Sequence, residues 1–193
     1  KLKEGLNKFK LVMLGNLDPG TQMDILSQVE NDDKFVILDT MNYWIDNTEK
    51  KLFEIISKVN LIVINDEESK MIAKSDSLQK CAEHIINCGP EYVIIKKGSK
   101  GAELFSKQKK STIPAFNIKN VIDPTGAGDT FVGGICGYLN SRPKIDFVEL
   151  HNSMIYGTVI ASFCIEEFGL AGLQKLKKEN IESRIKTFNK YLL

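Results

Sequence analysis

The sequence has little net charge, few cysteines and no long apolar run. Lysine and arginine total 26 against 25 aspartate and glutamate in 193 residues. This balance leaves no overall field to hold nucleic acid or a membrane surface, so neither is an expected partner. The four cysteines show no close pairing, which predicts reduced thiols in a cytoplasmic protein. The longest apolar runs, such as 61–64 and 92–95, fall far short of the ~20 residues that span a bilayer.

The hydrophobic content of 42% is typical of a folded domain. A domain of this size removes roughly 70% of its unfolded surface from water, so it needs no disulfide or structural metal. Short β-branched runs alternate with longer amphipathic stretches, which predicts an α/β fold with a mostly parallel sheet covered by helices. Because no internal repeat or low-complexity linker interrupts this pattern, we predict a single α/β domain over residues 1–193.

The predicted elements follow from apolar runs and their punctuation. Four buried parallel strands are predicted at Lys10 to Leu14, Phe35 to Asp39, Leu61 to Asn65 and Tyr92 to Lys96. Crossover helices are predicted at Thr21 to Glu30, Thr48 to Lys58, Glu67 to Ala73 and Ser77 to Asn87. Two antiparallel edge strands, Ala102 to Ser106 and Ser111 to Asn117, flank a polar turn. The remainder is predicted to be helical at Gly126 to Asn140, Asp146 to Phe168 and Leu173 to Tyr191.

The strongest functional signal is the segment D-P-T-G-A-G-D-T-F, residues Asp123 to Phe131, which follows the apolar pair Val121-Ile122. We interpret that pair as a strand end, followed by a Gly-rich turn and a helix. Small residues at a helix N-terminus leave backbone N–H groups free, and the helix dipole there favours an anion. The Asp129 carboxylate would repel a bound phosphate, so its presence beside an anion site is explained best if it removes a proton. An anion site next to a carboxylate therefore suggests phosphoryl transfer to a hydroxyl. An ordinary Gly-rich turn with a capping Asp is the alternative.

Two further segments carry weaker signals. The run Asn65-Asp66-Glu67-Glu68 follows a predicted strand, where open α/β sheets bind ligands. Acidic residues in the first turn of a helix, answering its dipole, are the alternative. The run Lys97-Gly98-Ser99-Lys100-Gly101 contains a single G-x-x-G, which is equally consistent with a structural turn.

The segment Asp123 to Phe131 resembles the C-terminal signature of the ribokinase-like (PfkB) family of carbohydrate and nucleoside kinases. The resemblance implies a three-layer ribokinase-like sandwich with a mostly parallel central sheet. It also implies an ATP-dependent kinase that transfers the γ-phosphoryl group to a hydroxyl of a sugar or nucleoside. Asp129 would then take the proton from the acceptor hydroxyl, and the amides of Gly126, Ala127 and Gly128 would form the anion hole.

Two other motifs match the family in the same order. Asn65 and Glu68 match an Asn-x-x-Glu motif, which implies that Glu68 holds the Mg²⁺ that accompanies ATP, through water. Asn65 would contact the nucleotide. By the same resemblance, Ser99 and Gly101 of the Gly-x-x-Gly loop are nucleotide contacts.

Three more positions resemble family sites. Asp123 and Thr125 resemble positions that supply oxygens to a monovalent cation such as K⁺ in some relatives, and Thr125 is also a nucleotide-contact candidate. Thr158 lies in a small-residue helix that walls the adenine pocket in the family, although tight helix packing explains those small residues equally well. The segment Asp39 to Trp44 departs from the family pattern, because the Arg found there in many relatives is absent.

Whole members of the family are longer than this chain. Their additional N-terminal part supplies early strands, a β-sheet lid and most acceptor-recognition residues. Asn16-Leu17-Asp18-Pro19 resembles a mid-chain strand end, so we expect this upstream portion to be absent here. The expected partners are a sugar or nucleoside and a second copy bound through the lid. The absent portion and the altered Asp39 to Trp44 segment leave an alternative open, a non-catalytic nucleotide- or metabolite-binding homologue that acts through a partner.

Overall fold

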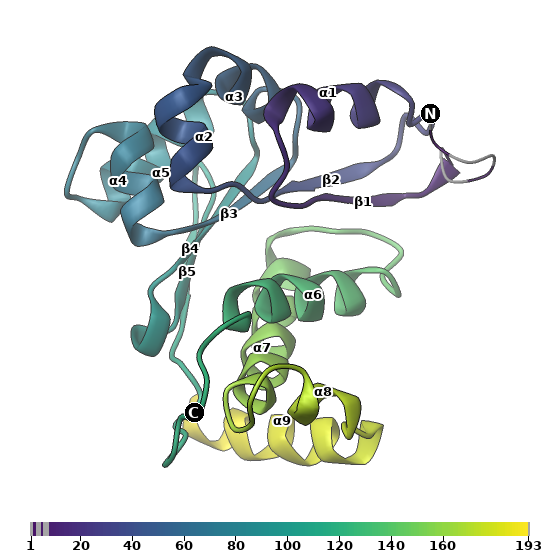
Figure 1. Ribbon diagram of the computed structural model, residues 1–193, viewed down its shortest axis with the longest axis vertical. Helices are drawn as coiled ribbons and strands as arrows, with labels where there is room; N and C mark the ends of the chain where they lie inside the picture. Colours follow the sequence, from purple (N-terminus) through teal and green to yellow (C-terminus); the bar gives the residue numbers. More distant parts are fainter. Residues whose placement is uncertain (1, 3–4, 6–7, 193) are drawn as a thin grey trace. The chain divides into compact units, whose positions relative to one another are not determined.

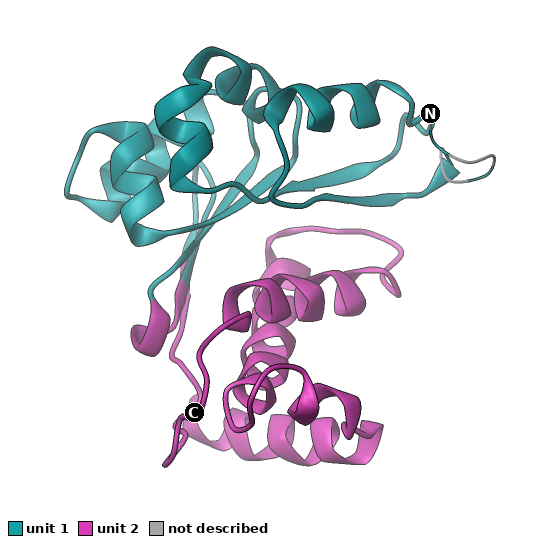
Figure 2. Ribbon diagram, in the orientation of Figure 1, with its two compact units in different colours: residues 1–97, 103–110 teal, residues 98–102, 111–193 magenta. Residues whose placement is uncertain are grey.

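The computed structural model describes residues 2, 5 and 8–192 (Figure 1). The chain forms two compact units (Figure 2). Unit 1 runs to Lys97 and includes Glu103–Lys110, and unit 2 comprises Gly98–Ala102 and Ser111–Leu193. The single domain expected from the sequence stays a prediction.

A mostly parallel sheet organises unit 1. The strands β1 (Leu11–Leu14), β2 (Phe35–Leu38), β3 (Leu61–Asn65) and β4 (Tyr92–Lys96) are parallel neighbours in chain order. The sheet continues through β5 (Ala102–Phe105) and β6 (Lys110–Ile113). The connection between β5 and β6 is too short for a parallel crossover, so these two strands form a hairpin. The fold is therefore α/β, as the sequence predicts.

The helices of unit 1 cover one face of this sheet (Figure 1). They are α1 (Pro19–Ser27), α2 (Asn42–Asn47), α3 (Glu49–Ile56), α4 (Asp66–Ala73) and α5 (Leu78–Asn87). Each crossover moves one strand along in the same direction, and right-handed crossovers then place every helix on the same side. Alternate strand residues such as Leu38, Ile64 and Ile95 pack there against helix residues such as Leu52 and Ile85.

Unit 2 is built on the helices α6 (Ala127–Leu139), α7 (Phe147–Cys164), α8 (Ala171–Gln174) and α9 (Lys178–Leu192), together with the short 3₁₀ turn η2 (Gly98–Lys100). The helices α6 and α7 approach each other closely. A Cβ atom added to Gly134 would lie 2.7 Å from the Cα of Gly157, so glycine is required at this crossing.

The structure corrects several expected boundaries. The predicted helix over 173–191 is two helices, because the Asn180 side chain accepts the Lys177 N–H at 3.1 Å and starts α9 afresh. The predicted helix over 146–168 ends at Cys164. The apolar pair Val121 and Ile122 is not a strand end; both side chains are exposed, and the Ile122 N–H donates to the Ile165 carbonyl.

Two further predictions from composition can be compared with the structure. The four cysteines are free thiols, as the sequence predicts. Within the described part of the chain, no helix combines the length and apolarity needed to cross a membrane.

Candidate functional site

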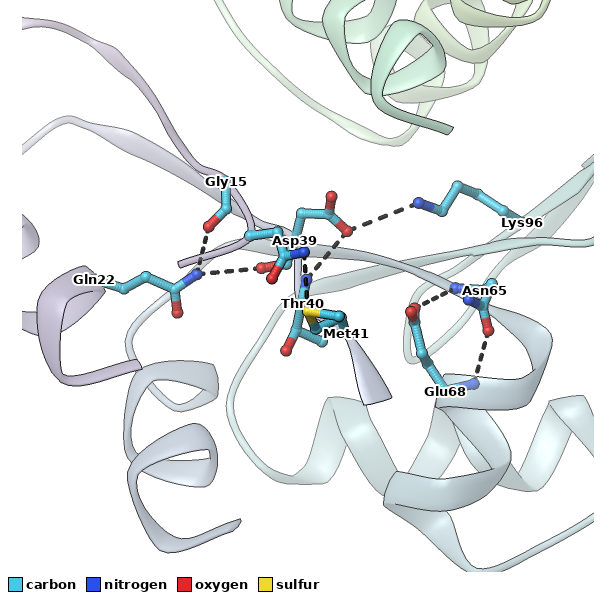
Figure 3. Close-up of polar contacts among 9 residues, drawn as sticks. Gly15, Gln22, Asp39, Thr40, Met41, Asn65, Glu68 and Lys96 are labelled. Carbon is cyan, nitrogen blue, oxygen red and sulfur yellow. Dashed lines mark hydrogen bonds and ion pairs between the residues drawn. The ribbon is translucent and has the colours of Figure 1, made fainter. Parts of the chain in front are cut away.

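Polar residues gather in unit 1 at the carboxyl ends of the parallel strands (Figure 3). Asp39 follows β2, Asn65 ends β3 and Lys96 ends β4. Since parallel strands all end at the same edge, this edge is where open α/β sheets bind ligands. We call it the carboxyl edge of unit 1.

Asn65 and Glu68 form a reciprocal pair at the start of α4. The Glu68 N–H donates to Asn65 Oδ1 at 2.8 Å, and the Asn65 N–H donates to Glu68 Oε2 at 2.9 Å. This is a capping box, so the structural alternative considered from the sequence is present. Burial raises the pKa of the Glu68 carboxyl, and the Asp39 carboxylate adds to the rise, whereas the Asn65 N–H and the Lys96 charge oppose it. The box holds one carboxylate oxygen and fixes the side chain at the carboxyl edge.

Asp39 and Lys96 form a second pair at this edge. Lys96 Nζ lies 3.7 Å from Asp39 Oδ1, and the Lys96 side chain is 20% exposed and the Asp39 side chain 7%. The Thr40 N–H also donates to Asp39 Oδ1, at 3.1 Å. Because β3 lies between β2 and β4, Lys96 reaches past the end of β3 to make this contact. Sequence reasoning did not single out Lys96, although a lysine that ends an apolar strand is a recognisable signal.

Two amide side chains join the loops that follow β1 and β2. Gln22 Nε2 donates to the carbonyls of Gly15 at 2.7 Å and of Asp39 at 3.2 Å. The Trp44 indole N–H donates to Asn16 Oδ1 at 2.9 Å. Trp44, which lies in α2 and belongs to the segment lacking the expected Arg, therefore ties that helix to the loop after β1.

The Gly-rich motif of unit 2 forms one turn at the N-terminus of α6. Asp123 Oδ1 accepts the Thr125 N–H at 3.0 Å, and Asp123 Oδ2 accepts the Gly169 N–H at 3.2 Å. Both hydrogen bonds lower the pKa of the Asp123 carboxyl, and the bond from Thr125 has the larger effect. Gly126, at φ +76°, is the N-cap residue of α6, and the exposed Asp129 lies in the first turn.

The three amides expected to form an anion hole have different surroundings. The Ala127 N–H donates to the Pro124 carbonyl at 3.2 Å, within the turn itself. Gly126 precedes the helix in a left-handed conformation, and Gly128 lies in the first turn of α6. A side chain at Gly126 would meet no neighbour within 4 Å, so its backbone conformation, and not space, requires glycine here.

The Gly98 to Gly101 turn has its own structural reason for glycine. Gly98 and Gly101 have φ values of +55° and +87°, and the Gly101 N–H donates to the Gly98 carbonyl at 3.0 Å. A Cβ on Gly101 would overlap the Ile113 carbonyl oxygen. Ser99 lies exposed within this turn. Nucleotide contacts by Ser99 and Gly101 stay predictions.

The small residues of α7 also serve packing. A Cβ on Gly157 would lie 2.6 Å from the Phe131 carbonyl oxygen of α6, and Thr158 beside it is buried. Thr158 therefore lies in a closely packed helix, and its contact with a nucleotide stays a prediction.

Comparisons with known proteins bear on the whole of this fold. The model of the pfkB family carbohydrate kinases matches residues 7–176. A cytidine kinase from Thermococcus kodakarensis is 29% identical over 147 residues, which are 73% of this chain and 52% of the relative. A nucleoside kinase from Methanocaldococcus jannaschii is 31% identical over 124 residues, 63% of this chain and 38% of the relative. The chain thus spans about half or less of the length of these curated relatives.

Solved structures show the same fold. The ribokinase from Giardia lamblia superposes with a TM-score of 0.80 at 17% identity, covering 95% of this chain and 61% of that one. An aminoimidazole riboside kinase from Salmonella enterica gives 0.78 at 17% identity, covering 92% and 63%. With the family model matching most of its length, the chain belongs to the pfkB family of carbohydrate kinases.

Proposed function

We propose that the protein containing this chain is an ATP-dependent kinase that transfers the γ-phosphoryl group to a hydroxyl of a sugar or nucleoside. The observation that carries the proposal is the turn before α6, where Gly126 adopts a left-handed conformation, amides begin a 13-residue helix and Asp129 lies exposed in the first turn. Family membership supports a phosphotransferase. The Salmonella enterica neighbour is described in complex with aminoimidazole riboside and an ATP analogue, which supports a nucleotide and a small hydroxyl-bearing acceptor.

Each residue of the turn has a distinct role in the proposed reaction. Asp129 accepts the proton of the acceptor hydroxyl as the hydroxyl oxygen attacks the γ-phosphorus of ATP, and the bond from that phosphorus to the bridging oxygen breaks to release ADP. The amides of Gly126, Ala127 and Gly128 stabilise the charge on the transferring group, and the α6 dipole adds to their effect. The Ala127 N–H would exchange its bond to Pro124 for one to the phosphoryl oxygen.

The carboxyl edge of unit 1 fits a magnesium–nucleotide complex. Glu68 supplies a buried carboxylate oxygen, the hard ligand that Mg²⁺ prefers, and the capping box orients it. When bound, Mg²⁺ supplies charge neutralisation to the phosphates. Asn65, Ser99, Gly101, Thr125 and Thr158 are the proposed nucleotide contacts, and Asp123 is the proposed ligand of a monovalent cation such as K⁺.

Replacement of Asp129 tests this function. Asp129→Asn in the protein expressed from its native start is expected to bind Mg·ATP normally and to lose turnover with a pool of sugars and nucleosides, read by product mass. Asp33→Asn, on the exposed surface, is the matched control. An Asp129→Asn variant that kept most of its rate would remove Asp129 as the base. ATP binding by the wild type without product from any acceptor would favour a non-catalytic binding homologue.

A further inference from the structure

An ion pair joins the chain just before the Gly98–Gly101 turn to the chain just after it. Lys97 directly precedes the turn, and Glu103 follows it on β5. The Lys97 ammonium donates to Glu103 Oε1 at 2.6 Å. The Lys97 side chain is 16% exposed and the Glu103 side chain 12%. Because both charges are largely withdrawn from water and salt, they interact more strongly than an exposed pair would.

The Glu103 carboxylate is shared between two lysines. Lys110 of β6 lies 3.0 Å from Glu103 Oε2, so each carboxylate oxygen has its own cation. Burial acts to raise the pKa of the Glu103 carboxyl, but the hydrogen bonds and charges of the two lysines outweigh burial and leave that pKa below its ordinary value. Glu103 is therefore a fixed negative charge at neutral pH, held from both sides.

The turn itself supplies little rigidity of its own. Gly98 and Gly101 both have positive φ values, and glycine gives the backbone more freedom than any other residue. A Cβ on Gly98 would meet no atom of the described residues within 4 Å, whereas Gly101 packs against the Ile113 carbonyl. The Gly98 end of the turn is thus open, and the adjoining Lys97 is anchored by Glu103.

A segment that binds a ligand gains affinity when it already has the bound shape. Ordering a flexible segment costs conformational entropy, and that cost is subtracted from the binding free energy. The peptide bonds from Lys97 to Gly98 and from Ala102 to Glu103 connect the turn to the ion pair. By holding both ends, the pair narrows the conformations open to the residues between them.

We propose that Lys97 and Glu103 are positioning residues that hold the Gly98–Gly101 turn in its nucleotide-binding shape, so that their ion pair sets the affinity for ATP and not the rate of phosphoryl transfer. This inference rests on the proposed function, in which Ser99 and Gly101 contact the nucleotide. Neither Lys97 nor Glu103 needs to touch ATP, because each acts through the backbone of the turn.

Removal of the Glu103 charge tests this role. Glu103→Gln keeps the size of the side chain but takes the counter-ion from Lys97. In the protein expressed from its native start, the Kd and KM for Mg·ATP are expected to rise about three- to tenfold, because fewer molecules hold the turn in the competent shape. The kcat and the acceptor KM should not change, since the lost binding is common to ground state and transition state. Calorimetric titration measures the Kd, and product mass gives the kinetic constants.

Hydrogen exchange of the Gly98–Ala102 amides reports on the turn without any turnover. These amides are expected to exchange faster in Glu103→Gln than in the wild type when nucleotide is absent. At saturating Mg·ATP the two proteins should exchange alike, because the bound nucleotide orders the turn in both.

Further variants separate the Lys97–Glu103 pair from a general effect of charge. Lys110→Met is the matched comparison, because Lys110 contacts the same carboxylate from β6, a strand that the turn does not join; it should change the Kd for ATP less than Lys97→Met does. Lys97→Met combined with Glu103→Gln should be no weaker than Glu103→Gln alone, since both remove one interaction. Lys97→Arg should recover much of the affinity. Lys107→Met and Glu91→Gln, both exposed, are the controls.

The possible results separate this inference from the proposed function. An unchanged Kd for Mg·ATP in Glu103→Gln overturns the inference while the kinase stands. Tighter binding by Glu103→Gln would mean that the released Lys97 binds the phosphates itself, and also overturns it. A fall in Tm with the kcat and both KM values weakened alike assigns the pair a purely structural role. A wild type that binds no ATP removes the proposed function and the inference together, whereas ATP binding without product removes the kinase and leaves the Kd and exchange measurements to decide the inference.

Discussion

The Asn65 side chain accepts the backbone N–H of Glu68, and the Glu68 carboxylate accepts the backbone N–H of Asn65. The same two residues thus start a helix and hold a carboxylate at the end of β3. A capping box does not by itself distinguish structure from function, because both need the same geometry. The two roles differ in whether the Glu68 side chain must carry a negative charge: the capping box needs only an acceptor oxygen, whereas the proposed Mg²⁺ contact needs the carboxylate.

Glu68→Gln is expected to weaken Mg·ATP binding while leaving the fold intact. Glutamine completes a capping box as glutamate does, so the free energy of unfolding should change by no more than about 1 kcal/mol. The loss of the negative charge removes the proposed Mg²⁺ contact. Calorimetric titration with Mg·ATP measures the effect, and Glu67→Gln, exposed in the same first turn, is the control. Equal binding by Glu68→Gln and Glu67→Gln would count against the magnesium role.

The Asp123 carboxyl is expected to make stability depend on acid pH. Its pKa in the folded protein lies below the ordinary 3.8, because the Thr125 and Gly169 N–H groups favour the ionised form. A lowered folded-state pKa contributes stability that is fully present above the unfolded value and lost as pH falls through the folded value. Wild type and Asp123→Asn should therefore differ most in Tm at neutral pH and converge below pH 3.8. Thermal unfolding across this range measures it, and a constant difference would contradict the assignment.

Gly134→Ala is expected to destabilise unit 2. The new Cβ would lie 2.7 Å from the Cα of Gly157, and backbone cannot yield as a flexible side chain does. Overpacking of this kind costs about 1–3 kcal/mol. Gly133→Ala, one position earlier, meets no neighbour within 4 Å and should stabilise α6 by up to about 1 kcal/mol. Denaturant unfolding compares them, and a shift of the same sign in both would show that the α6–α7 crossing yields.

Arg184→Met is expected to loosen α9 from α7. Arg184 Nη1 donates to Glu166 at 2.7 Å and to the buried Ser162 at 2.9 Å, and the guanidinium stacks on Phe163 at 3.5 Å. Losing these partly buried, charged hydrogen bonds should cost about 1–3 kcal/mol.

Hydrogen exchange of the α9 amides, together with denaturant unfolding, measures the effect of Arg184→Met. The control is Lys178→Met, which removes an exposed ion pair to Glu182 and should change stability by less than about 0.5 kcal/mol. Equal effects of Arg184→Met and Lys178→Met would mean that Arg184 does not hold the helix.

Local signals predicted much of the secondary structure. The bounds of β3 and β4 match the expected runs Leu61 to Asn65 and Tyr92 to Lys96, because a strand buried along its length is apolar throughout. The helix expected from Ser77 begins with that serine as its cap. The Gly-rich turn before α6 was also predictable, since Gly126 needs a left-handed backbone.

Other expectations failed where tertiary contacts outweighed local preference. Val121 and Ile122 have strand-forming side chains, but strand propensity depends on a partner strand, and these residues lie exposed beside Ile165. The helix α2 was not predicted, because its six residues are too few to leave a periodic pattern in the sequence.

The sequence by itself determined the α/β class, the positions of the four parallel strands and the Asp123 to Phe131 motif, because these depend on periodicity and on residues close along the chain. Only the tertiary structure brought Lys96 to Asp39 and Gln22 to the carbonyls of Gly15 and Asp39. Those contacts require the order of β1 to β4 in the sheet, which joins strand ends distant in sequence. No local pattern encodes that order, because it is decided by which packing buries the apolar faces of all the elements together.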